Sequence, residues 1–192
     1  MPESTLVCKA QVLQAFRRDT LGSKREPRVA ASFGFADAWE SVAMDPGFNI
    51  ADFRAKHLKE INEYRKKHAA DPLVLDEELN KFAQEWADTI SKSNALQHRP
   101  ENKYGENIAA GYPLADVDAV KKWYGEESKY DYEAGRFSND TGYFTQLVWR
   151  NSRRLGVGVA KSAQGWYVIV ANFDPPGNFI GSFVQNVGTK RK

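Results

Sequence analysis

Polar residues suited to acid–base catalysis or metal binding lie around a turn-rich segment in the middle of the chain. His98 stands in ALQHRPE, just before KYGENIAAGYP, and loops on rigid scaffolds often carry functional residues. Glu106 lies in the second segment between Gly105 and Asn107. Its carboxylate is expected either to hold the loop through backbone hydrogen bonds or to act as a metal ligand or general base. The spacing favours the structural role and leaves the catalytic role open.

A second carboxylate belongs to a helical pattern further along the chain. Glu126 follows Trp123 by three residues, so its side chain lies beside an apolar face and is expected to reach inward. His57 and His68 fit the pattern of an earlier helix and are expected at the surface or at a helix end rather than as ligands. The chain contains no common phosphate loop, no HExxH and no GxSxG, and Cys8 has no evident catalytic partner.

The stretch TGYFTQLVWRN, residues 141–151, places Thr145 and Gln146 among large apolar side chains. Burying either polar group without a partner costs about 1 to 3 kcal/mol. We therefore predict that both side chains are buried and hydrogen-bonded to neighbouring backbone.

Apolar spacing predicts the elements that position these residues. Leu58, Ile61, Tyr64 and His68 predict an amphipathic helix over 52–68, and Asp76 is a plausible N-cap for a second helix. A third helix is predicted over 116–130. The period then changes to alternation in 155–160 and to an apolar run in 166–171, which predicts a β-hairpin. Helices first and strands later indicate an α+β fold, with helices packed on an antiparallel sheet.

Composition limits the class of protein. The chain has 192 residues, 42% of them hydrophobic, which is enough for one well-cored domain. A net charge of +2 does not favour nucleic-acid binding. Cys8 is the only cysteine, so no intramolecular disulfide forms and a reducing compartment is expected. We expect no secretory signal or membrane span, and Pro2 excludes N-myristoylation. The sequon at Asn139 would matter only on export.

Residues 1–48 differ from the rest of the chain. Scattered basic residues, Gly22, Pro27 and the Asp45-Pro46-Gly47 turn predict an N-terminal extension that is partly disordered or loosely docked. Within it, residues 6–16 fit either a short amphipathic helix or a solvated segment. Residues 49–192 are expected to form the main domain, ending in a short basic tail.

Four segments together resemble the CAP superfamily, named for cysteine-rich secretory proteins, antigen 5 and pathogenesis-related proteins. GYFTQLVW at 142–149 with Ser152 looks like its first signature, and VIVANFDPPGNF at 168–179 looks like its second. Asn62-Glu63-Tyr64-Arg65 and Gly105-Glu106-Asn107 match in order. The resemblance is closest to the intracellular, Golgi-associated branch, because Ala171 replaces a usual cysteine. It implies an α-β-α sandwich with a central antiparallel sheet and a large cleft, and a partly helical first signature.

The resemblance also implies a set of site residues. The cleft tetrad of the family, two histidines and two glutamates, falls on His98, Glu106, Glu126 and Tyr143. The tyrosine replaces a histidine and is a poor zinc ligand, so a divalent metal held by His98, Glu106 and Glu126 is weakened and no cofactor is expected. The Tyr143 phenol is expected to donate to one of the glutamates instead. The signature residues of the family fall on Asn107, Thr145, Gln146, Trp149, Gly177 and Asn178.

The function expected from this resemblance is non-enzymatic binding of lipid, sterol or an anionic membrane surface. The cleft and a basic patch would carry it, and each cation near such a surface adds about 1 kcal/mol. The patch consists of Arg150, Arg153, Arg154, Lys190, Arg191 and Lys192. One alternative is a protein-interaction module, whose partner could be a second copy of the chain in a homodimer. The other is a hydrolase that uses Glu106 as general base with His98. An intracellular location is expected, in the cytoplasm or peripherally on Golgi or other membranes, with non-classical export as the alternative.

Overall fold

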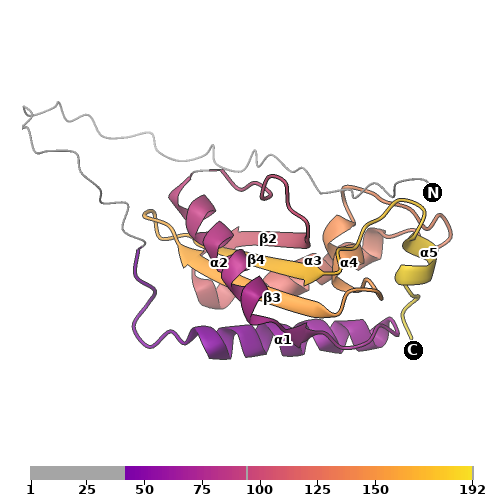
Figure 1. Ribbon diagram of the computed structural model, residues 1–192, viewed down its shortest axis with the longest axis horizontal. Helices are drawn as coiled ribbons and strands as arrows, with labels where there is room; N and C mark the ends of the chain where they lie inside the picture. Colours follow the sequence, from indigo (N-terminus) through magenta and orange to yellow (C-terminus); the bar gives the residue numbers. More distant parts are fainter. Residues whose placement is uncertain (1–41, 94, 192) are drawn as a thin grey trace, which may run out of the picture.

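The computed structural model describes residues 42–93 and 95–191 (Figure 1). The predicted amphipathic segment at 6–16 lies outside the described residues, as does the last residue of the basic tail. In chain order the helices and strands are α1 Ile50–Lys67, β1 Val74–Leu75, α2 Glu77–Lys92, β2 Gly105–Gly111, α3 Ala119–Gly125, α4 Gly142–Leu147, β3 Arg154–Lys161, β4 Tyr167–Asp174 and α5 Phe183–Asn186.

The strands form one sheet in the order β1-β3-β4-β2. The predicted hairpin is confirmed, because β3 and β4 pair antiparallel from Arg154↔Asp174 to Lys161↔Tyr167. β2 also runs antiparallel to β4, which places Glu106 opposite Asn172. The short β1 pairs parallel with β3, so the sheet is mixed at that edge rather than wholly antiparallel.

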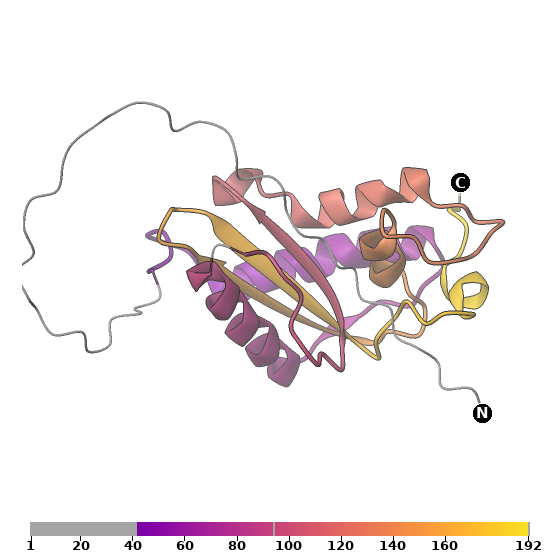
Figure 2. The ribbon, with the colours of Figure 1, turned by 90° about the horizontal axis from the view of Figure 1, so that it is seen from above.

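Helices cover both faces of the sheet (Figure 2). On one face, α2 packs its apolar side against Ile108, Val168 and Val170. On the other face, residues of α1, α3 and α4 share a larger core with alternate residues of β3 and β4. The expected α-β-α sandwich is therefore confirmed.

Two glycines of β3 let α2 approach the sheet closely. A Cβ at Gly156 would lie 2.2 Å from the backbone of Leu79, and a Cβ at Gly158 would lie 2.4 Å from that of Gln84. Both distances are shorter than any van der Waals contact. Gln84 uses this proximity: its side chain accepts from Val159 N–H at 3.1 Å and donates to Val159 O at 2.8 Å. The alternation of glycine with valine in β3 thus reflects helix packing on one face and core on the other.

The helix predictions hold in part. The first helix begins at Ile50 behind the N-cap Asn49, and Asp76 caps the second helix as predicted. The third helix is shorter than predicted: α3 ends at Gly125 and continues as a 3-10 turn over Glu126–Lys129. The first signature is helical in α4, as the resemblance implies.

The end of the predicted extension contacts the hairpin. Val42 forms a β-bridge with Lys161, whose ammonium lies 2.6 Å from the Asp45 carboxylate. The Tyr167 hydroxyl donates to the same carboxylate. Among the described residues, no helix combines the length and apolarity needed to cross a bilayer.

Candidate functional site

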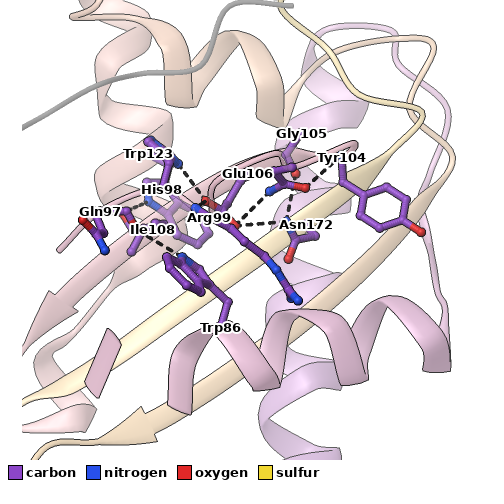
Figure 3. Close-up of polar contacts among 11 residues, drawn as sticks. Trp86, Gln97, His98, Arg99, Tyr104, Gly105, Glu106, Ile108, Trp123 and Asn172 are labelled. Atoms are coloured by element: carbon purple, nitrogen blue, oxygen red, sulfur yellow. Dashed lines mark hydrogen bonds and ion pairs between the residues drawn. The ribbon is translucent and has the colours of Figure 1, made fainter. Parts of the chain in front are cut away.

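Glu106 is the centre of a polar network between β2 and the loop that carries His98 (Figure 3). Its Oε1 accepts from His98 Nδ1 at 2.8 Å and from Arg99 N–H at 3.0 Å. Its Oε2 accepts from Asn102 Nδ2 at 3.0 Å and Asn172 Nδ2 at 3.3 Å. A carboxylate offers about four lone-pair positions, and these four donors fill them.

This arrangement supports the structural role predicted for Glu106. Its side chain is fully buried. It ties the 98–102 loop to β2 and, through Asn172, to β4. A general base needs a lone pair directed at the substrate, and each oxygen of this carboxylate already accepts two hydrogen bonds. The geometry therefore disfavours the hypothesis that Glu106 acts as the general base of a hydrolase.

Glu126 holds the start of α4. Its Oε2 accepts the main-chain N–H of Tyr143 at 2.8 Å and of Phe144 at 3.2 Å. These N–H groups have no partner within the helix, and a negative charge is favourable at that end of a helix. The side chain reaches inward as predicted, and these hydrogen bonds anchor the first signature segment.

The four tetrad positions come together in space through these contacts. The rings of His98 and Tyr143 lie 6.2 Å apart, Glu106 contacts His98, and Glu126 contacts the Tyr143 backbone. Among the residues that the structure describes, no three His, Cys, Asp or Glu side chains form a group that could hold a metal ion.

The donor set at the tetrad does not fit a divalent metal well. His98 is oriented by a carboxylate, as metal-binding histidines are, but Tyr143 stands where the family has a second imidazole. Both carboxylates are engaged by N–H donors. The expectation of weakened metal binding agrees with this geometry and stays a prediction.

The signature residues form a buried hydrogen-bonded joint between the two signatures. Thr145 Oγ1 donates to Asn178 Oδ1 at 2.6 Å, and Gln146 Oε1 accepts from Gly177 N–H at 2.8 Å. A Cβ at Gly177 would lie 2.7 Å from the Trp149 ring, so only glycine fits there. The prediction that Thr145 and Gln146 are buried and satisfied is confirmed.

Asn107 completes this joint from β2. Successive strand residues alternate, so the Asn107 side chain lies on the face of the sheet opposite to that of Glu106. There its Nδ2 donates to Tyr143 O at 3.0 Å. One short tripeptide, Gly105-Glu106-Asn107, therefore fixes the histidine loop on one side of the sheet and α4 on the other.

No role was predicted for the side chain of Arg65, although this residue lies in a segment that matches the family. Arg65 is fully buried and donates to four carbonyls: Asp71 O at 2.8 Å, Leu147 O at 3.0 Å, Trp149 O at 2.9 Å and Ser152 O at 3.1 Å. Burial lowers its pKa to about 10. The available signal was its position four residues after Ile61, on the apolar face of α1.

His57 and His68 were expected at the surface or at a helix end. The surface part of this expectation is wrong, because both are buried, whereas His68 does lie at a helix end as the C-cap of α1. The two residues are 4% and 0% exposed. His68 Nδ1 donates to Gly188 O at 2.8 Å and Nε2 accepts from Tyr124 at 3.0 Å, because the C-terminal segment returns across α1 and covers the ring. Burial lowers the pKa of both histidines.

The predicted basic patch is divided by the fold. Arg154 is held by the carboxylates of Asp76, at 2.9 Å, and Asp174. Arg150 and Arg153 lie near the C-terminal end of α1, where Arg150 donates to His68 O. The tail reaches the same place, since Arg191 N–H donates to Lys67 O at 2.8 Å. Lys192 lies outside the described residues.

Comparison with known proteins agrees with these features. Residues 58–173 match the model of the family described as "CAP: Cysteine-rich secretory protein family". The chain is 36% identical over 146 residues to the Golgi-associated plant pathogenesis-related protein 1 of Homo sapiens, which covers 73% of this chain and 95% of that protein. It is 39% identical over 127 residues to the basic form of pathogenesis-related protein 1 of Nicotiana tabacum, covering 65% and 71%.

Solved structures show the same fold. The structure of BmVAL-1 has a TM-score of 0.60 at 19% identity, covering 76% of this chain and 88% of that chain. The crystal structure of NaASP2 with Zn²⁺ has a TM-score of 0.59 at 23% identity, covering 77% and 90%. With the family match over residues 58–173 and both signatures joined in one buried network, the chain belongs to the cysteine-rich secretory protein (CAP) family.

Proposed function

We propose that the protein binds anionic lipid surfaces reversibly, without catalysing a reaction. The observation that carries this proposal is a cationic cluster at the C-terminal end of α1. We define the cluster as Lys66, Lys67, Arg150, Arg153, Lys190 and Arg191. It differs from the patch predicted from the sequence by including two lysines of α1 and by omitting two residues. Arg154 is omitted because two aspartates neutralise its charge, and Lys192 because it lies outside the described residues.

Backbone contacts gather these residues from three parts of the chain. Arg191 N–H donates to Lys67 O at 2.8 Å, and Arg150 Nη2 donates to His68 O at 3.4 Å. Arg153 in turn donates to Arg150 O. Figure 1 shows the C-terminus beside the end of α1.

The cluster members remain available to a charged surface. All except the half-buried Arg150 are exposed. The ion pair of Arg153 with Asp71 has a distance of 3.6 Å between exposed side chains, and pairs of this kind contribute little. A cation close to an anionic membrane contributes about 1 kcal/mol, so several together give reversible attachment.

Vesicle co-sedimentation tests the proposal. We expect binding to phosphatidylcholine vesicles that contain an anionic lipid, little binding to phosphatidylcholine alone, and release at high salt because ions screen the attraction. Lys67→Gln with Lys190→Gln should weaken binding about thirtyfold, from about 1 kcal/mol for each cation. Lys81→Gln with Lys92→Gln, on α2 across the sheet, is the matched control and should bind as the unmodified protein does.

Binding that persists in high salt, or that is equal on neutral vesicles, would overturn the proposal. Equal binding by the Lys67→Gln, Lys190→Gln variant and the Lys81→Gln, Lys92→Gln control would overturn it as well.

A second proposal is a protein interaction, with a second copy as the partner. Ile180 and Val184 near α5 are 60% and 72% exposed. They lie beside a pocket of about 390 Å³ whose lining includes Trp149, Pro176 and Phe179. Light scattering at increasing concentration tests this: Val184→Lys should abolish a dimer, and a monomer at all concentrations would contradict the proposal.

The location of the protein and sterol binding in the cleft stay predictions. A peripheral location on Golgi or other membranes suits the lipid proposal, and the Golgi-associated relative is named for such a place. Imaging of the tagged full chain in eukaryotic cells, with and without Lys67→Gln and Lys190→Gln, would test this location.

A further inference from the structure

A pocket of about 690 Å³ opens beside the cationic cluster. Its lining combines one face of α1, the turn at 69–72 and the C-terminal tail. The lining residues that matter for binding are Lys59, Glu63, Lys66, Asp71 and Arg191. Lys66 and Arg191 belong to the cationic cluster, whereas Lys59 and Glu63 do not.

The floor of the pocket is a stripe along α1. Lys59, Asn62, Glu63 and Lys66 are spaced by three and four residues, so their side chains lie on one face of the helix. Lys59 and Lys66 stand at the two ends of this stripe with Glu63 between them. A ligand lying along the helix would meet a positive, a negative and a positive group in turn.

Hydrogen bonds to the backbone hold the walls in place. Arg65 Nε donates to Asp71 O at 2.8 Å, and Ala70 N–H donates to Arg65 O at 3.1 Å. Asn62 Nδ2 donates to Leu73 O at 3.0 Å. On the other side, the tail is fixed by Arg191 N–H on Lys67 O. A pocket with fixed walls binds a ligand with a smaller loss of conformational freedom.

The charges of the lining distinguish between anionic ligands. Of the two carboxylates in the lining, Asp71 has a cation, Arg153, 3.6 Å away, whereas Glu63 forms no ion pair with another described residue, and neither do Lys59 and Lys66. A ligand with only negative groups would suit the three cations and would be repelled by Glu63. A ligand that adds a primary ammonium to its anionic groups would satisfy all of them, because an ammonium donates to a carboxylate.

We propose that this pocket binds a phosphoserine-type group, with its phosphate and carboxylate on Lys59, Lys66 and Arg191 and its ammonium on Glu63. On a membrane this group is the head of phosphatidylserine. The lipid form of this inference rests on the proposed lipid binding and names its headgroup. Phosphatidylglycerol has the same net charge and no ammonium, so it provides the matched comparison.

The test compares phosphatidylcholine vesicles in which one third of the lipid is phosphatidylserine or phosphatidylglycerol. We expect the unmodified protein to prefer phosphatidylserine about tenfold, from one charge-assisted hydrogen bond. Glu63→Gln should abolish the preference without weakening binding to phosphatidylglycerol. Lys59→Gln should weaken binding to phosphatidylserine, whereas Lys56→Gln, one turn earlier on α1 and outside the lining, should leave the preference unchanged.

Calorimetry with O-phospho-L-serine separates the headgroup from the membrane. If the protein binds O-phospho-L-serine and Glu63→Gln abolishes this binding, the proposed pocket chemistry is supported. If it binds O-phospho-L-serine but no vesicles, only the assignment of the group to a membrane lipid is overturned. Equal binding to both anionic vesicles overturns the pocket proposal and leaves the electrostatic proposal standing. A preference that survives Glu63→Gln also overturns it.

Discussion

The buried guanidinium of Arg65 should make a large contribution to the stability of the fold. Its four hydrogen bonds join α1 to the carbonyls of Asp71, Leu147, Trp149 and Ser152. Bonds from a charged donor contribute about 1.5 kcal/mol or more each, so Arg65→Met would forfeit about 6 kcal/mol. Burial lowers the pKa of Arg65 to about 10, which corresponds to about 3 kcal/mol of desolvation that the methionine would recover.

The expected net loss for Arg65→Met is therefore about 3 kcal/mol in the free energy of unfolding. That is a large fraction of the 5 to 15 kcal/mol typical of a domain. Urea unfolding followed by tryptophan fluorescence measures this loss. Arg65→Lys should not restore stability, because one ammonium cannot reach all the carbonyls that lie around the edge of the planar guanidinium.

Arg54→Met is the control for this experiment. Arg54 also lies on α1, but among the described residues its side chain donates to one carbonyl, from Nε to Val157 O at 2.9 Å. Its replacement should therefore cost about 1 kcal/mol or less. A loss under about 1 kcal/mol for Arg65→Met, or full rescue by Arg65→Lys, would refute the reasoning.

Four further predictions follow from the contacts of single residues. Gly158→Ala should lower stability by about 1 to 3 kcal/mol in urea unfolding, because its Cβ would overlap α2, whereas Gly125→Ala meets no atom within 4 Å and should be neutral or stabilising. Burial lowers the pKa of His68, so the unfolded chain binds more protons below about pH 6.5 and stability falls as the pH drops through that value; His68→Gln should flatten this dependence, and an unchanged profile would contradict it. Glu126→Ala should lower the melting temperature by exposing two N–H groups of α4, with a cost of about 1 to 2 kcal/mol, and a full-stability variant would contradict this role. Zinc titration calorimetry should show weak binding or none for the unmodified protein and a gain for Tyr143→His, and equal affinities would contradict the assigned effect of the tyrosine.

Local patterns in the sequence predicted most of the fold. The spacing of apolar residues placed α1 and α2 within a few residues, and the change of period at Leu155 located the β3–β4 hairpin. These elements could be read because each buries a face whose periodicity is recorded in consecutive residues. The spacing of apolar residues does not show how the helices and strands are layered. That order was predicted from the resemblance of the signatures to the CAP superfamily.

For the candidate site, the residues were predicted from the sequence but their roles were not. The sequence named His98, Glu106 and Glu126, but it left open whether Glu106 binds a ligand or holds a loop. That question depends on donors distant in sequence, such as Asn172, which lies opposite Glu106 in the sheet. Burial of His68 was missed for a similar reason, since Gly188 covers it from the other end of the chain.

The sequence by itself determined the class of fold, the family signatures and the identities of the polar groups, because these follow from residue type and short-range spacing. Only the tertiary structure decided how those groups are used. It engaged both glutamates with N–H donors, paired Arg154 with two aspartates and brought the tail back to Lys67 at the end of α1. The physical reason is that hydrogen bonding and charge pairing depend on distances between residues far apart in the chain, and folding alone sets those distances.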